Sequence, residues 1–178
     1  MTTAQHVIVM GVAGSGKSSV ATLLAEQLGW VLAEGDEFHP QANIDKMSAG
    51  QPLDDDDRQP FLEAIRDWVR AKGAEGVSTI VTCSALKRSY RDVLREAGPV
   101  RFAHLTGDVD TISERMEKRT DHFMPPSLLA SQFATLEQLD DDEDGMAVSI
   151  DGTLEEITGT IVESLRLEAS PAADARES

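Results

Sequence analysis

The segment Gly11–Ser18 constrains the fold of this chain more than any other part of the sequence. It reads Gly-Val-Ala-Gly-Ser-Gly-Lys-Ser and fits the pattern G-x-x-x-x-G-K-[ST]. A short, β-rich apolar run, His6–Met10, precedes it. Apolar residues at helical spacing follow it over Lys17–Leu28, with Gly29 as the expected stop. A strand, a glycine-rich turn and a helix in this order predict the first unit of a parallel α/β sheet.

This turn has the composition of a phosphate-binding loop. Glycines let successive backbone N–H groups point inward at phosphate oxygens, and the following helix adds the positive end of its dipole. Lys17 is expected to reach the β- and γ-phosphates of a nucleotide, and the Ser18 hydroxyl is expected to ligate Mg²⁺. The predicted nucleotide-binding residues are Gly11, Val12, Ala13, Gly14, Ser15, Gly16, Lys17 and Ser18.

Short apolar runs alternate with helical periods along the rest of the chain. Further strands are predicted over 30–33, 77–82, 100–105 and 146–150, and further helices over 87–96, 109–119, 127–139 and 154–167. Another helix is expected to begin near 57–60, because proline is tolerated only in the first turn. The alternation predicts one α/β domain over 1–167, with a doubly wound parallel sheet covered by helices on both faces. Residues 168–178 are predicted to form a disordered tail.

Composition excludes several classes of function. Sixteen Lys and Arg against 32 Asp and Glu give a net charge of −16, which disfavours nucleic-acid binding. No apolar run approaches the ~20 residues that span a bilayer, and Met1–Gln5 lacks the regions of a signal peptide. A single cysteine, Cys83, excludes an intramolecular disulfide. We therefore expect a cytoplasmic protein with neither a nucleic-acid nor a membrane partner.

The residues after the second predicted strand bear on the reaction. The sequence has no Asn/Thr-Lys-x-Asp guanine-binding motif and is short for an ATPase motor, so a kinase with a small acceptor is favoured. Ligands of such sheets bind at the carboxyl ends of the strands, where Glu34 and Asp36 stand. Asp36 could accept a proton from an attacking hydroxyl, and Glu34 could hold Mg²⁺ through water. The alternative is an ordinary polar turn or helix cap.

Beyond the loop, several blocks of sequence resemble the thermoresistant type of gluconate kinase, in the shikimate-kinase-like branch of P-loop kinases. With Gly11–Ser18, these blocks are Gly35–Pro40, Asn43–Met47, Gly50–Arg58, Cys83–Arg91, and His122–Pro125 followed by Ser131–Glu137. The resemblance implies phosphorylation of D-gluconate by ATP, with Mg²⁺, to 6-phospho-D-gluconate, which enters the pentose phosphate route. An acidic run over 140–144 lies outside the resemblance and is given no functional weight.

Gluconate carries a carboxylate and a row of hydroxyls, so its site needs a cation at one end and hydrogen-bonding groups along the rest. The candidate substrate-binding residues are Asp36, His39, Arg58, Ser84, Lys87, Arg91 and Gln132. Each has a plainer alternative. Arg58 could form a solvated ion pair at a helix start, and Lys87 and Arg91 could share an exposed helical face. Ser84 could cap the next helix, and His39 could serve turn packing.

Two arginines precede a proline-rich segment. Arg115 and Arg119 are four residues apart and are expected on one helical face, before a segment that Pro125 and Pro126 keep from being helical. In related kinases such arginines lie on a mobile lid that closes over ATP, here placed at about 119–127. An exposed, ion-paired helix face is the alternative. The predicted catalytic residues are Lys17, Asp36, Arg115 and Arg119, and the predicted metal ligands are Ser18 and Glu34.

Two other functions compete with gluconate phosphorylation. One is phosphorylation of shikimate or a nucleoside monophosphate by the same fold. The other is a nucleotide-dependent regulatory protein without catalysis, against which Lys17, Ser18, Asp36 and the two lid arginines argue. A homodimer is the expected assembly of the protein.

Overall fold

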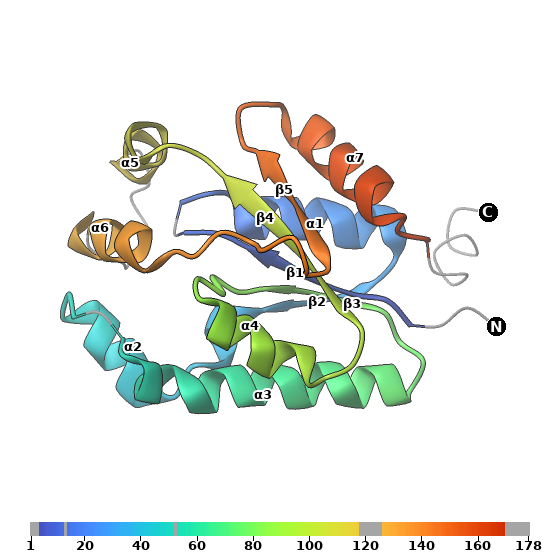
Figure 1. The fold of residues 1–178 in the computed structure, drawn as a ribbon, viewed down its shortest axis with the longest axis horizontal. Coiled ribbons are helices and arrows are strands. Elements are labelled where there is room, and N and C mark those ends of the chain that lie inside the picture. Colours follow the sequence, from blue (N-terminus) through green and yellow to red (C-terminus); the bar gives the residue numbers. More distant parts are fainter. Residues whose placement is uncertain (1–3, 13, 52, 118–125, 170–178) are drawn as a thin grey trace.

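The computed structural model describes residues 4–12, 14–51, 53–117 and 126–169 of the chain. Within these residues, parallel strands form a five-stranded sheet in the order β2-β3-β1-β4-β5 (Figure 1). The strands are β1 (His6–Met10), β2 (Val31–Glu34), β3 (Thr79–Thr82), β4 (Val100–Thr106) and β5 (Gly145–Ser149). Strand β1 is central, so the loop that follows it lies between the carboxyl ends of β3 and β4.

Helices cover both faces of this sheet (Figure 1). On one face, α1 (Lys17–Leu28) and α7 (Leu154–Leu165) pack against Val7 and Val9 of β1. On the other, α3 (Asp55–Ala74) and α4 (Arg88–Arg95) pack against Ile8 and Met10. Successive side chains of a strand point to opposite faces, so a strand buried on both sides is apolar throughout. The predicted doubly wound sheet is confirmed.

The remaining helices lie at the edge where the strands end. They are the short η1 (Gly35–Phe38), α2 (Gln41–Ser48), α5 (Val109–Glu117) and α6 (Pro126–Thr135). The predicted helix 127–139 therefore ends earlier, at Thr135. In the described parts of the chain, no helix is both long and apolar enough to cross a membrane.

The polar stretch before α3 is more ordered than its sequence suggests. Both η1 and α2 lie between β2 and α3, where the sequence analysis predicts no helix. Helix α3 begins at Asp55, before the expected 57–60, so Pro60 falls inside it. The reason is a capping box: the Asp54 carboxylate accepts from the Asp57 backbone N–H, and the Asp57 carboxylate accepts from that of Asp54.

Two expectations fall largely outside the described residues. The expected lid, 119–127, is described only from Pro126, where α6 begins. The expected tail is described only for Glu168 and Ala169. The carbonyl of Glu168 accepts a hydrogen bond of 3.0 Å from Nε1 of Trp30, which fixes the chain directly after α7.

Candidate active site

The Gly11–Ser18 loop runs from the end of β1 into the first turn of α1, as predicted. Gly11 has φ +149°, and a Cβ there would lie 2.8 Å from Ser15 Oγ and 2.9 Å from the carbonyl oxygen of Leu105. Only glycine fits this position. Lys17 folds back over the loop, and its Nζ donates to the carbonyls of Gly11 (3.1 Å) and Val12 (3.0 Å).

The loop also holds a polar atom suited to an anion. Ser15 is 1% exposed, and its Oγ has no hydrogen-bond partner among the described residues. A buried hydroxyl without a partner is costly, so such groups are normally satisfied by a ligand or by water. Together with the start of α1, this hydroxyl fits a bound phosphate group. Ala13 lies outside the described residues.

A carboxylate stands beside the start of α1. The Ser18 hydroxyl donates to Oε2 of Glu34 over 3.0 Å, and the Thr82 hydroxyl donates to the same oxygen over 2.6 Å. Mg²⁺ in phosphate-transfer sites is held through one or two carboxylates together with hydroxyls, waters and substrate phosphates. The neighbouring oxygens of Ser18 and Glu34 fit that donor set. Thr82 did not stand out in the sequence, because nothing local links it to Glu34.

The turn after β2 requires close backbone contact. A Cβ on Gly35 would lie 1.9 Å from the carbonyl oxygen of Thr82, so only glycine allows β2 and β3 to approach here. The backbone N–H of Gly35 donates to the Thr82 hydroxyl (3.1 Å). This contact fixes the position from which the next residue, Asp36, projects.

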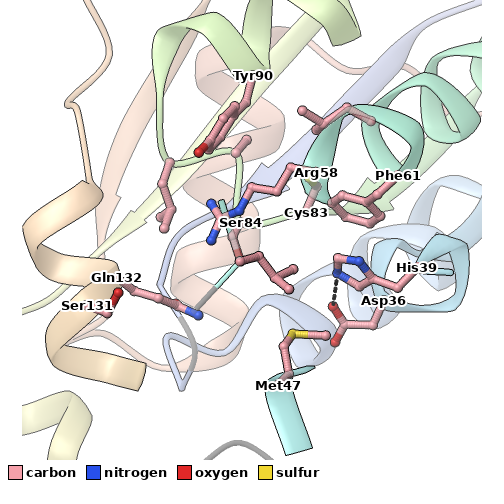
Figure 2. Close-up of a pocket in the computed structure, with 14 residues that line it drawn as sticks. Asp36, His39, Met47, Arg58, Phe61, Cys83, Ser84, Tyr90, Ser131 and Gln132 are labelled. Atoms are coloured by element: carbon pink, nitrogen blue, oxygen red, sulfur yellow. Dashed lines mark ion pairs between the residues drawn. The ribbon is translucent and has the colours of Figure 1, made fainter. Parts of the chain in front are cut away.

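A pocket opens beside the loop, at the carboxyl ends of β2 and β3 (Figure 2). Of the predicted substrate-binding residues, it is lined by Asp36, His39, Arg58, Ser84 and Gln132. It also contains residues that sequence reasoning had not assigned to a site, among them Met47, Phe61 and Tyr90. The wall of the pocket touches the phosphate loop, because the backbone N–H of Gly11 donates to the carbonyl of Ser84 (3.3 Å).

His39 is held firmly in this pocket. Its ring stacks on Phe61 with centroids 3.7 Å apart and an angle of 11° between the planes, and its Nδ1 lies 3.2 Å from Nδ2 of Asn43. Its Nε2 lies 4.0 Å from Oδ1 of the exposed Asp36 (Figure 2). Burial lowers the pKa of His39, and the field of Arg58 lowers it further, against the opposing effect of Asp36. A neutral imidazole can donate from one nitrogen and accept at the other.

Arg58 brings positive charge to the pocket wall. Its guanidinium lies 5.0 Å from the centroid of the Tyr90 ring, within the range of a cation–π interaction. The Tyr90 hydroxyl donates to Oδ1 of Asp55 (2.5 Å), which fixes the ring that Arg58 faces. Lys87 donates to the same Asp55 oxygen (3.1 Å), and this hydrogen bond raises the pKa of Lys87. Lys87 is thus engaged at the start of α4 and does not line the pocket.

The expectation for Arg91 needs correction. Lys87 is the residue before α4, whereas Arg91 lies in the helix and is fully buried, so the two do not share an exposed face. The Arg91 guanidinium donates to both carboxylate oxygens of Glu143, at 2.7 and 3.0 Å. It also donates to the carbonyls of Ala85 (2.8 Å) and Gln138 (3.3 Å). Arg91 is occupied by protein groups and does not line the pocket.

The acidic run 140–144, to which the sequence analysis gives no functional weight, supplies the carboxylate that pairs with Arg91. Glu143 is buried against Arg91, and Asp140 and Asp142 accept hydrogen bonds from Arg88. Burial raises the pKa of Glu143, but the hydrogen bonds from Arg91, the Asp140 backbone and Arg95 outweigh it and bring the pKa down to about 2. The carboxylate is therefore ionised at neutral pH.

The remaining residues singled out in the sequence are Cys83, Gln132 and the arginines near the predicted lid. Burial raises the pKa of Cys83 to about 12, so its thiol stays protonated at neutral pH, which fits a packing role. Arg115 belongs to α5, but its side chain and all of Arg119 lie outside the described residues. Gln132 reaches the pocket from α6, the helix that follows the predicted lid.

A glycine-rich phosphate loop on the central strand of a parallel sheet, with a polar pocket beside it, defines a small P-loop kinase. The family model described as "AAA domain" matches residues 7–139. The gluconokinase of Gluconobacter oxydans is 50% identical over 146 residues, 82% of each chain. The thermoresistant gluconokinase of Escherichia coli is 42% identical, over 93% of this chain and 98% of that one. The chain belongs to the gluconokinase family.

Solved structures agree with this assignment. A gluconokinase from Sinorhizobium meliloti is 42% identical, with a TM-score of 0.83 over 99% of this chain and 98% of that one. A sugar kinase from Janibacter is 48% identical, with a TM-score of 0.90 over 96% and 98% of the two chains. A shikimate kinase from Aquifex aeolicus, at 17% identity and a TM-score of 0.64, shares the fold alone.

Proposed function

We propose that this protein transfers the γ-phosphoryl group of ATP to a hydroxyl of D-gluconate, giving 6-phospho-D-gluconate. The observation that carries the proposal is the pocket that joins Asp36, His39, Arg58, Ser84 and Gln132 directly beside the phosphate loop. The similarity to proteins named gluconokinase supports gluconate as the acceptor. Reacting groups held side by side need no further encounter in solution, which is a large part of catalysis.

The pocket suits a polyhydroxy acid. A guanidinium binds a carboxylate well because its planar N–H groups match the two oxygens, so we assign the carboxylate of gluconate to Arg58. His39, Ser84 and Gln132 supply neutral hydrogen-bonding groups for the hydroxyls. Phe61 and Tyr90 hold His39 and Arg58 in place, as described above.

Asp36 is the proposed acceptor of the proton from the attacking hydroxyl. It is an exposed carboxylate at the pocket wall, beside His39, where the reacting end of the substrate would lie. Lys17 would bind the β- and γ-phosphates after releasing the loop carbonyls that it now contacts. Arg115 and Arg119 are proposed to stabilise charge on the transferred phosphoryl group.

Ser18 and Glu34 are the residues proposed to hold Mg²⁺. When bound, the ion neutralises negative charge on the phosphate oxygens. Thr82 holds the Glu34 carboxylate toward Ser18. Such supporting hydrogen bonds orient metal ligands and tune their affinity.

The direct test is an assay of ADP release by the purified protein with ATP and Mg²⁺. Four samples are compared: gluconate, shikimate, a nucleoside monophosphate, and no acceptor. We expect rapid release with gluconate alone. Faster release with another acceptor would identify a different kinase of this fold. No acceptor-dependent release, with retained ATP binding, would indicate a regulatory protein.

Two further proposals concern the assembly and the cellular location of the protein. We expect a homodimer and a cytoplasmic location. Light scattering after size-exclusion chromatography would measure the assembly, since a monomer of this chain has a mass of 19.3 kDa. Cell fractionation would measure the location.

A further inference from the structure

One short turn connects the phosphate loop to the acceptor pocket. It consists of Ser84, Ala85 and Leu86, between β3 and α4, and all three residues line the pocket. Ser84 is labelled in Figure 2. Ala85 has φ +46°, in the left-handed region that residues other than glycine and asparagine rarely adopt. Such strain persists only where the surrounding structure imposes it.

Three hydrogen bonds impose this conformation, one on each carbonyl of the turn. The Ser84 carbonyl accepts from the backbone N–H of Gly11 (3.3 Å), and the Leu86 carbonyl accepts from that of Glu137 (2.7 Å). The Ala85 carbonyl, at the strained residue itself, accepts from Nη1 of Arg91 (2.8 Å). The hydrogen bond to the Ala85 carbonyl is the only one of these three that a side chain donates, so a substitution of Arg91 can remove it.

Arg91 is itself fixed in one position by Glu143. Neither side chain is exposed, and the guanidinium and carboxylate meet through two hydrogen bonds. Glu143 is in turn held by the backbone N–H of Asp140 (2.8 Å) and by Nη2 of Arg95 (2.9 Å). This network leaves the guanidinium a single orientation, with Nη1 directed at the Ala85 carbonyl.

Stability alone does not account for such a pair. Taking two charges out of water costs about as much as their attraction returns, and apolar residues of similar volume often serve equally well. What apolar residues cannot supply is a directed hydrogen bond to a strained carbonyl. The pair therefore provides a hydrogen bond to the Ala85 carbonyl, which acts on the conformation of the turn.

We propose that Arg91 and Glu143 are positioning residues for the acceptor site. They hold the Ser84–Leu86 turn in its strained form, so that Ser84 faces the substrate. Neither residue touches the substrate. The proposal rests on the proposed gluconate kinase activity, and it assigns the acceptor-binding geometry to a buried pair on the far side of the turn.

The effect should be confined to one substrate. Without the Arg91 contact, the Ala85 carbonyl loses its partner and the turn relaxes, which displaces Ser84 in the pocket wall. The phosphate loop has no hydrogen bond to Arg91 in the described structure, and its backbone contact with the turn, from the Gly11 N–H to the Ser84 carbonyl, is not removed by a substitution at Arg91. The KM for gluconate should therefore rise while the KM for ATP stays close to that of the wild type.

The test is the double variant Arg91→Met/Glu143→Leu in the full-length protein. Removing one charge alone would leave the other buried and unpaired and destabilise the fold, whereas removing both leaves neither charge of the pair behind. We expect a rise of about tenfold or more in the KM for gluconate, the size expected for a lost hydrogen bond to the turn. The melting temperature should fall moderately, because Arg95 and the Asp140 backbone N–H lose the Glu143 carboxylate, whereas the KM for ATP should change little.

Arg88→Gln is the matched control. Arg88 lies on the same helix and binds the same acidic run through Asp140 and Asp142, but it does not donate to the Ala85 carbonyl. Its KM for gluconate should equal that of the wild type. If the double variant does not fold, Arg91→Lys replaces it, because a lysine can pair with Glu143 but lacks the planar fork that also reaches Ala85.

The outcomes separate this inference from the proposed function. A folded double variant, or a folded Arg91→Lys variant, with wild-type KM for gluconate would overturn the positioning role. Equal rises in the KM for gluconate and ATP would also overturn it, since they would indicate general loosening of the fold. A wild-type protein without gluconate-dependent ADP release would contradict the proposed function instead.

Discussion

The hydroxyl of Thr82, at the end of β3, donates a hydrogen bond of 2.6 Å to the carboxylate of Glu34, at the end of β2. The same carboxylate oxygen accepts from Ser18, at the start of α1. A residue on a third element therefore orients a proposed metal ligand. Thr82 is 4% exposed and also accepts from the backbone of Gly35, so its own position is fixed.

Thr82→Val should weaken the response to Mg²⁺. Valine keeps the shape but cannot orient Glu34, so we expect the Mg²⁺ concentration for half-maximal activity to rise by about tenfold. Titration of Mg²⁺ at fixed ATP and gluconate measures this. Thr79→Val is the control, because Thr79 lies at the other end of β3 and contacts His6. An unchanged Mg²⁺ response in Thr82→Val would separate Thr82 from the metal site.

Lys17→Ala should abolish most turnover without unfolding the protein. The Lys17 side chain is half-buried and donates to loop carbonyls, so we expect its removal to leave the hydrophobic core intact. We expect a loss of at least about 3 kcal/mol of transition-state stabilisation. Turnover and thermal melting are measured together, with the surface variant Lys72→Ala as control. Near-normal turnover in a folded Lys17→Ala variant would contradict the role of Lys17.

Asp36→Asn tests the proposed proton acceptor. Asparagine keeps the shape but removes the negative charge, so turnover should fall by about 10²–10⁴-fold. ATP affinity should stay unchanged, because the phosphates are bound by the loop. Calorimetric ATP binding and gluconate-dependent ADP release are measured on one preparation, with the exposed neighbour variant Glu37→Gln as control. Substantial turnover in Asp36→Asn would assign Asp36 to a turn.

Arg119→Ala tests the predicted lid, of which Arg119 itself lies outside the described residues. Its charge is needed mainly in the transition state, so we expect kcat to fall far more than gluconate binding weakens. Steady-state kinetics with gluconate as the varied substrate gives both quantities. A weaker gluconate affinity with unchanged kcat would instead place Arg119 in the acceptor site.

His104 should make the free energy of unfolding depend on pH. It is 1% exposed, and its Nδ1 has no partner in the described structure. Burial, aided by the charge of Arg91, lowers its pKa to about 4. The unfolded chain, with a histidine pKa near 6.5, then takes up the proton first. Stability from this group is fully present above pH 6.5 and is lost as the pH falls toward 4.

Denaturant titrations of wild type and His104→Phe between pH 7 and 4 would measure this. The wild type should lose about 3 kcal/mol more than the variant over that range. Glu143 acts in a lower window, because its depressed pKa makes its contribution fall only between about pH 4.5 and 2. Parallel stability curves for the two proteins would contradict the assignment to His104.

Structural features that depend on residues adjacent in the chain could be predicted from the sequence. The phosphate loop is one contiguous motif between a strand and a helix, and both elements have the predicted bounds. The periodicity of apolar residues predicted the remaining strands to within two residues, because burial on one or both faces repeats locally. The start of α3 was missed because the reciprocal capping of Asp54 and Asp57 outweighed the position of Pro60.

Features that depend on which direction a side chain faces were decided by the tertiary structure. The sequence placed Lys87 and Arg91 together, but packing of α4 against β4 buries Arg91 and leaves Lys87 at the helix start with Asp55. Glu143 carried no signal within an acidic run, because only the fold brings it to Arg91, 52 residues away in the chain.

The pocket depends both on residues that the sequence identifies and on the tertiary structure that brings them together. Sequence alone named Asp36, His39, Arg58, Ser84 and Gln132 as separate candidates, and the parallel sheet brings them to one edge. The chemistry of each residue is set by its side chain, which the sequence states directly. Its role depends on distances between groups far apart in the chain, and these are fixed only when the sheet and helices bury their apolar faces together.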